Sequence, residues 1–218
     1  MLIFLFGALS VALQCLRSVP QVVDLLRSKN SAGVSVATWA VGLFSGLVWL
    51  SWGLANHLWA QVLGNALVAL GSGVVLAGCW PSKRAAVLRA TVLALIGFVL
   101  VLLLGLLAAW LLSAVALAVA MLGTLPQVIE VLRDSDLGGV SVWSWLLSGA
   151  NAVTWTVYGA LVGSWVTMAP GVVVLPSCLF IAWKAHRFLQ GARAAHTQAG
   201  DGQARDSEAA GLGLEVRA

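Results

Sequence analysis

The segment Pro20-Gln21-Val22-Val23-Asp24 recurs later in the chain as Pro126-Gln127-Val128-Ile129-Glu130, an offset from 20 to 126 of 106 residues. The same offset aligns further residues: Arg27 with Arg133, Gly33-Val34-Ser35 with Gly139-Val140-Ser141, Trp39 with Trp145, Trp49 with Trp155, Gly53 with Gly159, and Trp59 with Trp165. Because several of these are rare residue types in fixed register, the pattern indicates an internal duplication.

The composition places this duplicated chain in a lipid bilayer. Of 218 residues, 61% are hydrophobic and 9% are charged, whereas soluble domains carry about 25% charged residues. A chain this apolar could not hide its nonpolar surface in one water-soluble core of this size. The net charge of +4 does not indicate a nucleic-acid partner, because the basic residues lie in short segments between apolar runs.

Seven apolar runs are each long enough to cross the bilayer as a helix. They are Leu2–Val23, Val34–Leu54, Leu58–Ala77, Val87–Leu107, Leu111–Leu132, Val140–Val162 and Trp165–Trp183. The break between the fourth and fifth runs rests on Gly105, Trp110 and the combined length of the stretch. We therefore predict an all-α membrane protein with a three-helix repeat at 1–80, a linker helix at 81–110, a second repeat at 111–189 and a disordered cytoplasmic tail at 190–218.

The Lys and Arg residues alternate with the predicted spans. They occur after the first, third, fifth and seventh runs, and the other loops carry none. By the positive-inside rule, the N-terminus lies outside and the C-terminus lies in the cytoplasm. Since a three-helix unit followed directly by its copy would be inverted, the fourth span restores the orientation and the two repeats should be parallel. Arg outnumbers Lys nine to three, which is typical of a GC-rich prokaryotic source and thus of the cell membrane.

The duplicated Pro-Gln, the Gly-Val-Ser before each second span and the Trp49–Gly53 and Trp155–Gly159 segments resemble the PQ-loop/MtN3 superfamily, in particular the SWEET and SemiSWEET sugar transporters. The resemblance covers nearly everything before the tail. It implies transport of a small polar solute, a sugar, by alternating access between two helical bundles. It also implies hinges at Pro20 and Pro126, which agrees with the way proline kinks helices. Gln21 and Gln127 could then satisfy the backbone groups that the kinks free.

The resemblance also implies a solute site. In SemiSWEETs a Trp late in the second span and an Asn in the third line the pocket; these match Trp49 and Asn65, and the second-repeat Trp matches Trp155. The second Asn position holds Gly171, a departure from the pattern. Two polar residues one turn before the tryptophans face the same way and add to the expected pocket. The expected solute-binding residues are Ser45, Trp49, Asn65, Asn151 and Trp155.

Asp24 and Glu130 leave two interpretations open. They could couple transport to protons, or they could pair with Arg27 and Arg133, three residues further on. Proton coupling would suit the runner-up function, a PQ-loop amino-acid transporter.

Other classes of function are less well supported by the sequence. A receptor or assembly protein would need a basic pocket, and no Lys or Arg lies deep in the outer half of a span. We expect no catalytic site, metal or cofactor, since no nucleophile–base pair, metal cluster or phosphate loop is found. The expected partners are the lipid bilayer and a small-molecule solute, and a homo-oligomer remains open because family members also oligomerise.

Overall fold

The computed structural model describes residues 1–28, 31, 34–122, 125–133, 137 and 140–215, without the side chains of 192–215 and of several residues in α1, α4 and α5. Its described residues form helices and connecting turns without a strand, so the predicted all-α class is confirmed. The helices are α1 (Leu2–Ser28), α2 (Val36–Ala55), α3 (Trp59–Leu107), α4 (Ala109–Leu122), α5 (Leu125–Arg133), α6 (Val142–Leu161) and α7 (Trp165–Glu215).

The long helix α3 contains two predicted spans, which meet at a kink. Lys83 has non-helical angles (φ −131°, ψ 32°), two residues after Pro81. Proline removes a backbone hydrogen bond and clashes with the preceding turn, so it favours a bend here. The Lys83 ammonium also donates to the carbonyl oxygens of Ser31 at 2.6 Å and Val34 at 2.8 Å, which ties the bend to the α1–α2 connection. The kink at Lys83 lies in the loop that the sequence predicts between the third and fourth spans.

The helix α3 ends at Leu107, the predicted end of the fourth span, and Ala108 has extended angles (φ −154°, ψ 112°). The predicted fifth span, Leu111–Leu132, contains α4 and α5, and residues 123–124 between them are outside the described part.

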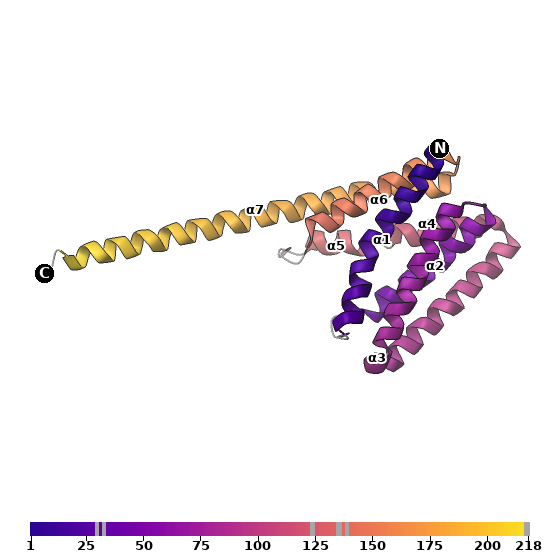
Figure 1. Ribbon diagram of the computed structural model, residues 1–218, viewed down its shortest axis with the longest axis horizontal. Coiled ribbons are helices and arrows are strands. Elements are labelled where there is room, and N and C mark those ends of the chain that lie inside the picture. The colour runs from indigo at the N-terminus through magenta and orange to yellow at the C-terminus, as the bar shows by residue number, and fades with distance from the viewer. Residues whose placement is uncertain (29–30, 32–33, 123–124, 134–136, 138–139, 216–218) are drawn as a thin grey trace.

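The helices form two bundles of three spans (Figure 1). In the first bundle, the part of α3 before Lys83 contacts both α1 and α2; in the second, α7 contacts α6 and the α4–α5 pair. The bundles meet where α1 contacts α6 and where α2 contacts α4. The α1–α6 contact is the repeat equivalent of the α2–α4 contact, because α1 corresponds to α4–α5 and α2 corresponds to α6. Residues 84–107 pack against α2 and α4, for instance through Phe98 and Val101.

Local geometry repeats with the sequence. Ser35 and Ser141 cap the N-termini of α2 and α6, each accepting a backbone N–H at 3.3 Å. Asp, Asn, Ser and Thr side chains commonly cap helices in this way. The connection between α2 and α3 and the connection between α6 and α7 share a hydrogen bond. It runs from Leu58 N to Gly53 O at 2.9 Å in the first and from Ser164 N to Gly159 O at 2.8 Å in the second. These matches at an offset of 106 residues support the duplication.

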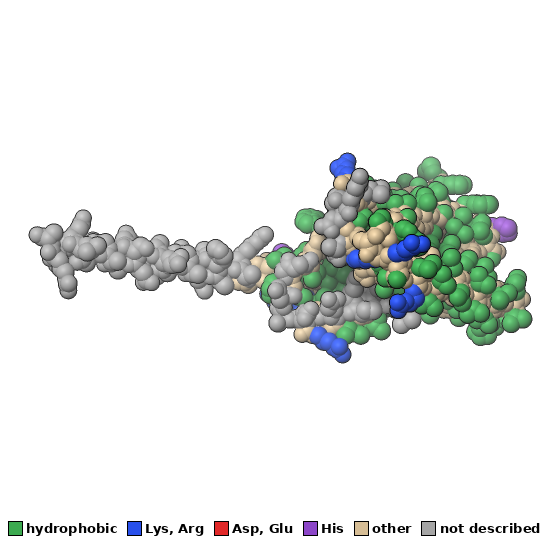
Figure 2. Space-filling model, turned by 90° about the horizontal axis from the view of Figure 1, so that it is seen from below, with side chains coloured by type: hydrophobic (Ala, Val, Ile, Leu, Met, Phe, Trp, Pro, Cys, Tyr) green, Lys and Arg blue, Asp and Glu red, His purple; other side chains and the backbone are tan. Residues whose placement is uncertain are grey.

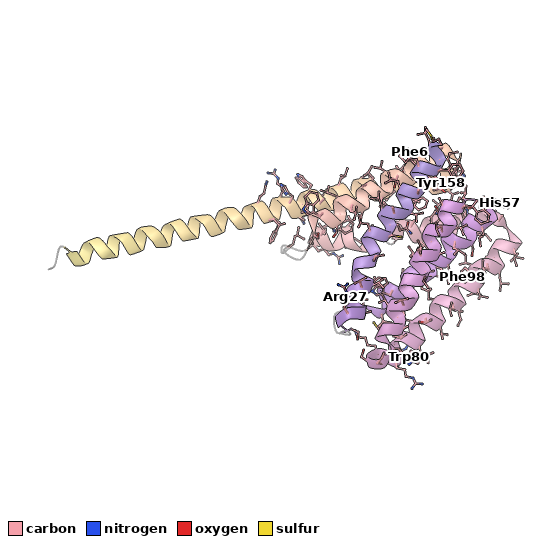
Figure 3. All side chains as sticks on the ribbon, viewed as in Figure 1. Phe6, Arg27, His57, Trp80, Phe98 and Tyr158 are labelled. Atoms are coloured by element: carbon pink, nitrogen blue, oxygen red, sulfur yellow. The ribbon has the colours of Figure 1, made fainter. Side chains whose placement is uncertain are left out.

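The two repeats are parallel, as predicted. A side-chain carbon placed on Gly7 would lie 2.9 Å from Ala60 and 3.2 Å from the ring of Tyr158. The start of α1, the start of α3 and the end of α6 therefore meet at one end of the molecule. Figure 3 shows Phe6, His57 and Tyr158 at this end, with Arg27 and Trp80 at the opposite end of the first bundle.

The surface of the bundles suits a bilayer. Many large hydrophobic side chains are exposed, especially from α3 and α4. Among the described residues, Val36–Ala55, Trp59–Leu107 and Trp165–Gly191 are long and apolar enough to cross a membrane, and Leu2–Leu16 and Ala109–Met121 are shorter apolar helices. Figure 2, seen from the end that holds Arg27 and Trp80, shows Lys and Arg side chains on this face. The separation of a basic end from a neutral end fits the predicted loop pattern.

The sequence predicts a disordered tail after residue 189. The backbone of α7 continues as a helix to Glu215, beyond the bundles (Figure 1). Its alanine content favours a helix, since alanine has the highest helix propensity. The side chains of 192–215 are outside the described part, so disorder of this segment remains a prediction for solution measurement.

Candidate functional site

A cavity of about 220 Å³ lies between the two bundles. All five residues predicted to bind the solute line it, from α2, α3 and α6. Its lining residues are Gln14, Ser45, Trp49, Gln61, Asn65, Val68, Ala120, Ser148, Asn151, Ala152, Trp155, Thr167, Pro170, Gly171 and Val174. The structure thus brings the predicted residues together around one space.

Most of this lining consists of repeat-equivalent pairs, related by the offset of 106 residues. The pairs are Gln14 with Ala120, Ser45 with Asn151, Trp49 with Trp155, Gln61 with Thr167, Asn65 with Gly171, and Val68 with Val174. The cavity therefore lies on the pseudo-twofold axis that relates the bundles. The Trp pair and the Val pair are identical, whereas the side chains of the other four pairs differ, so the apolar part of the site is duplicated while its hydrogen-bonding groups are not.

The aromatic part of the site is nearly symmetric. Trp49 meets Trp52 edge to face with ring centroids 5.6 Å apart, and Trp155 meets Tyr158 in the same manner at 5.7 Å. Such pairs contribute about 0.5–1.5 kcal/mol beyond their buried area, so they help to fix the rings. The Trp52 indole N–H also donates to Ser113 Oγ at 3.0 Å, linking α2 to α4. One flat indole surface from each bundle is thereby held at the cavity.

The polar part of the site is rich in carboxamides. Asn65 Nδ2 donates to the carbonyl oxygen of Gln61, one turn earlier in α3, at 2.9 Å. This hydrogen bond orients the Asn65 amide. Gln61 and Asn151 are 5% and 7% exposed, and their side-chain oxygens have no hydrogen-bond partner in the described part. A buried unpaired acceptor costs about 1–3 kcal/mol. Both amides could therefore gain by accepting a donor from a bound molecule after a rotation of the last torsion.

Gly171 explains why the second repeat lacks the expected asparagine. A side-chain carbon at 171 would lie 1.7 Å from Thr156 Oγ1 and 3.1 Å from the Ala152 carbonyl oxygen, so α6 and α7 cross too closely for a side chain. At the equivalent crossing in the first repeat, the glycine is Gly46, on the other helix. The small residue has thus changed helix between the repeats, and the first repeat keeps room for Asn65.

Four polar lining residues were missed by the sequence analysis, namely Gln14, Gln61, Ser148 and Thr167. The repeat contained a signal for two of them. Gln61 lies one turn before Asn65, and Thr167 is its equivalent in the second copy. Gln14 is a polar residue inside an apolar run, where such residues commonly mark a functional site.

The described lining residues carry no formal charge. A site without charged groups favours a neutral solute, because a carboxylate or ammonium placed here would lose its hydration without gaining a counter-ion. Two indole faces with hydroxyl and amide groups suit a molecule that has both nonpolar faces and hydroxyl groups.

The side chains of the predicted hinge residues Pro20, Gln21, Pro126 and Gln127 are outside the described part, as are those of Asp24 and Glu130. Their predicted roles stay predictions. Across the described residues, no group of His, Cys, Asp and Glu is arranged to hold a metal ion.

Comparison with known proteins agrees with this fold. No protein-family model matches the chain, and no curated protein matches it. Among solved structures, the chain is similar to a eukaryotic SWEET transporter determined at 3.7 Å resolution, with a TM-score of 0.74 over 87% of this chain and 97% of that chain. The sequence identity is 16%, so the similarity establishes the fold. The chain is a helical membrane protein with the seven-helix fold of a SWEET transporter.

Proposed function

We propose that this chain carries a small neutral polar solute, a sugar, across the membrane by alternating access between its two bundles. The observation that carries the proposal is the cavity on the pseudo-twofold axis, lined by one tryptophan from each bundle and by uncharged polar groups. A site between two quasi-identical bundles can be exposed to either side when the bundles rock against each other. The similarity to the fold of a SWEET transporter supports a transport function.

The arrangement in Figure 1 suits such rocking. The bundles are joined near the neutral end by the α1–α6 contact at Gly7 and Tyr158 and by the Trp52–Ser113 hydrogen bond. From there they diverge toward their basic ends. This arrangement corresponds to a carrier that is closed at its neutral end.

The proposal is tested by uptake into proteoliposomes that contain the purified chain, with a panel of labelled sugars and amino acids. We expect sugar uptake that equilibrates and does not depend on pH. Uptake of an amino acid that depends on pH and is abolished by Asp24→Asn or Glu130→Gln would instead establish the proton-coupled alternative.

Two variants test the site. Trp49→Ala and Asn65→Ala should each abolish uptake while the protein still inserts, because one removes a stacking surface and the other an amide of the cavity. The matched controls are Trp165→Ala and Asn56→Ala, since both residues are exposed and outside the lining. Normal uptake by both cavity variants would remove the site assignment.

A further inference from the structure

Gln14 connects the two bundles at the edge of the cavity. It lies in α1, is 8% exposed and uses both ends of its amide. Its Oε1 accepts a hydrogen bond from the Trp155 indole N–H at 3.0 Å, and its Nε2 donates to the Gly64 carbonyl oxygen at 3.2 Å. One side chain of the first bundle is thus fixed by α3 and in turn holds a tryptophan of the second bundle.

Gly64 makes the second contact that positions Trp155. A side-chain carbon at 64 would lie 3.2 Å from Cζ2 of Trp155, so the edge of the indole rests directly on the backbone of α3. The ring is therefore located by a contact at its edge and oriented by a hydrogen bond at its nitrogen. Together these two constraints leave the ring little rotational freedom.

The equivalent tryptophan, Trp49, lacks this hydrogen bond. Ala120 takes the place of Gln14 in the second repeat and offers no acceptor. Within the described residues, no group accepts a hydrogen bond from the Trp49 indole N–H. This nitrogen is not fully buried, so the lack of a partner leaves no buried unpaired donor. The cavity therefore contains one tryptophan with a fixed orientation and one whose N–H remains available.

We propose that Gln14 is a positioning residue, which acts on the solute through Trp155 by holding the indole in the orientation that stacks on the bound molecule. A ring that is already oriented does not lose rotamer freedom when the solute binds, so the affinity rises. The proposal rests on the proposed transport function. It differs from a purely structural role, in which Gln14 would only join α1 to α3 and α6.

The first experiment observes Trp155 without transport. In the purified protein with ¹⁵N-labelled tryptophan, the Trp155 indole resonance is assigned by its loss in Trp155→Phe. Gln14→Met keeps a long unbranched side chain and removes the acceptor, so this resonance should shift or broaden, while the same change at the exposed Gln190 leaves it in place. Gly64→Ala should also displace it, by moving the ring edge. An unchanged resonance in Gln14→Met overturns the proposal.

The second experiment measures uptake of radiolabelled D-glucose. Gln14→Met should raise KM roughly fivefold, as expected for one neutral hydrogen bond, with the maximal rate retained. Gln14→Glu, which in its neutral form keeps an acceptor oxygen for Trp155 and a donor for the Gly64 carbonyl oxygen, should restore most of the affinity. In the double variant Gln14→Met/Trp155→Phe, KM should match that of Trp155→Phe alone.

The outcomes separate this proposal from the transport function. If the two KM effects multiply in the double variant, Gln14 does not act through Trp155 and the proposal fails. If the maximal rate falls while KM is unchanged, Gln14 serves the movement of the bundles and the proposal also fails. If the wild-type chain carries no D-glucose, the sugar function fails, and the resonance experiment still decides whether Gln14 orients Trp155.

Discussion

At the scale of single residues, Gly171 shows how helix packing limits the symmetry of the site. A duplicated gene begins with two identical pockets, but each crossing of neighbouring helices needs a small residue on one side. The first repeat meets this need with Gly46 and the second with Gly171, so only one asparagine of the pair could remain.

This packing predicts that Gly171→Ala destabilises the protein. The new methyl group would overlap Thr156, and overpacking a close crossing costs about 1–3 kcal/mol. Thermal unfolding in detergent, followed by tryptophan fluorescence, should show a lower Tm. Adding Thr156→Gly should recover part of the loss, because Thr156 supplies the closest atoms. Gly73→Ala is the matched control, since no atom lies within 4 Å of the added carbon; an equal loss there would contradict this explanation.

The sequence analysis found the site residues whose positions a sequence pattern marks, and missed those whose role depends on a contact between distant segments. Trp49 and Trp155 align at the repeat offset, and the resemblance to SemiSWEETs indicated Asn65. Gln14 has an alanine as its equivalent, and its role depends on a hydrogen bond between residues 141 positions apart. No local pattern contains such a contact. The reason for the missing asparagine at 171 was also inaccessible, because it is a distance between two helices.

At the scale of elements, the two hairpins that join α2 to α3 and α6 to α7 share one backbone shape with different residues. His57 has a φ of +56° and its equivalent Gly163 has +69°. A residue with a side chain is strained in this left-handed region by about 1–2 kcal/mol, whereas glycine adopts it readily. The first hairpin therefore carries strain that the second avoids.

Exchanging these residues should move stability in opposite directions. His57→Gly should raise the free energy of unfolding by up to about 1 kcal/mol, the relief of strain being partly offset by the greater freedom of glycine in the unfolded chain. Gly163→Ala should lower it by about 1 kcal/mol. Chemical or thermal unfolding in detergent measures both, and D-glucose uptake should be unaffected because neither residue lines the cavity. A loss of stability in His57→Gly would show that the imidazole makes a contact worth more than the strain.

The sequence predicted the helices well where lipid alone determines them. Hydropathy located the spans and the breaks near Lys83 and Ala108. It did not locate the continuation of the α7 backbone as a helix to Glu215. That continuation depends on helix propensity in a segment whose polarity suggested disorder.

At the scale of the whole molecule, one spacer helix determines the relation between the halves. Residues 84–107 pack on the outside of α2 and α4, so they contribute to the bundles without lining the cavity. Their function is to cross the bilayer once more, which lets the second repeat enter with the same orientation as the first. The contacts around Gly7 place the start of the first repeat beside the end of α6, as a parallel arrangement requires.

Parallel repeats predict that both hairpins face the same side of the membrane. Single cysteines at Asn56 and Ser164, in a chain with Cys15 replaced by Ala, should both react with an impermeant thiol reagent added to intact cells. Cysteines at Arg84 and Arg187 should react only after permeabilisation, since the positive-inside rule predicts that the basic loops lie in the cytoplasm. Cys79 and Cys178 can remain because both are buried. Labelling of Asn56→Cys and Ser164→Cys from opposite sides would mean that the repeats are inverted. The pseudo-twofold axis could then not run along the membrane normal. Alternating access by the two bundles, as proposed for this chain, depends on that axis.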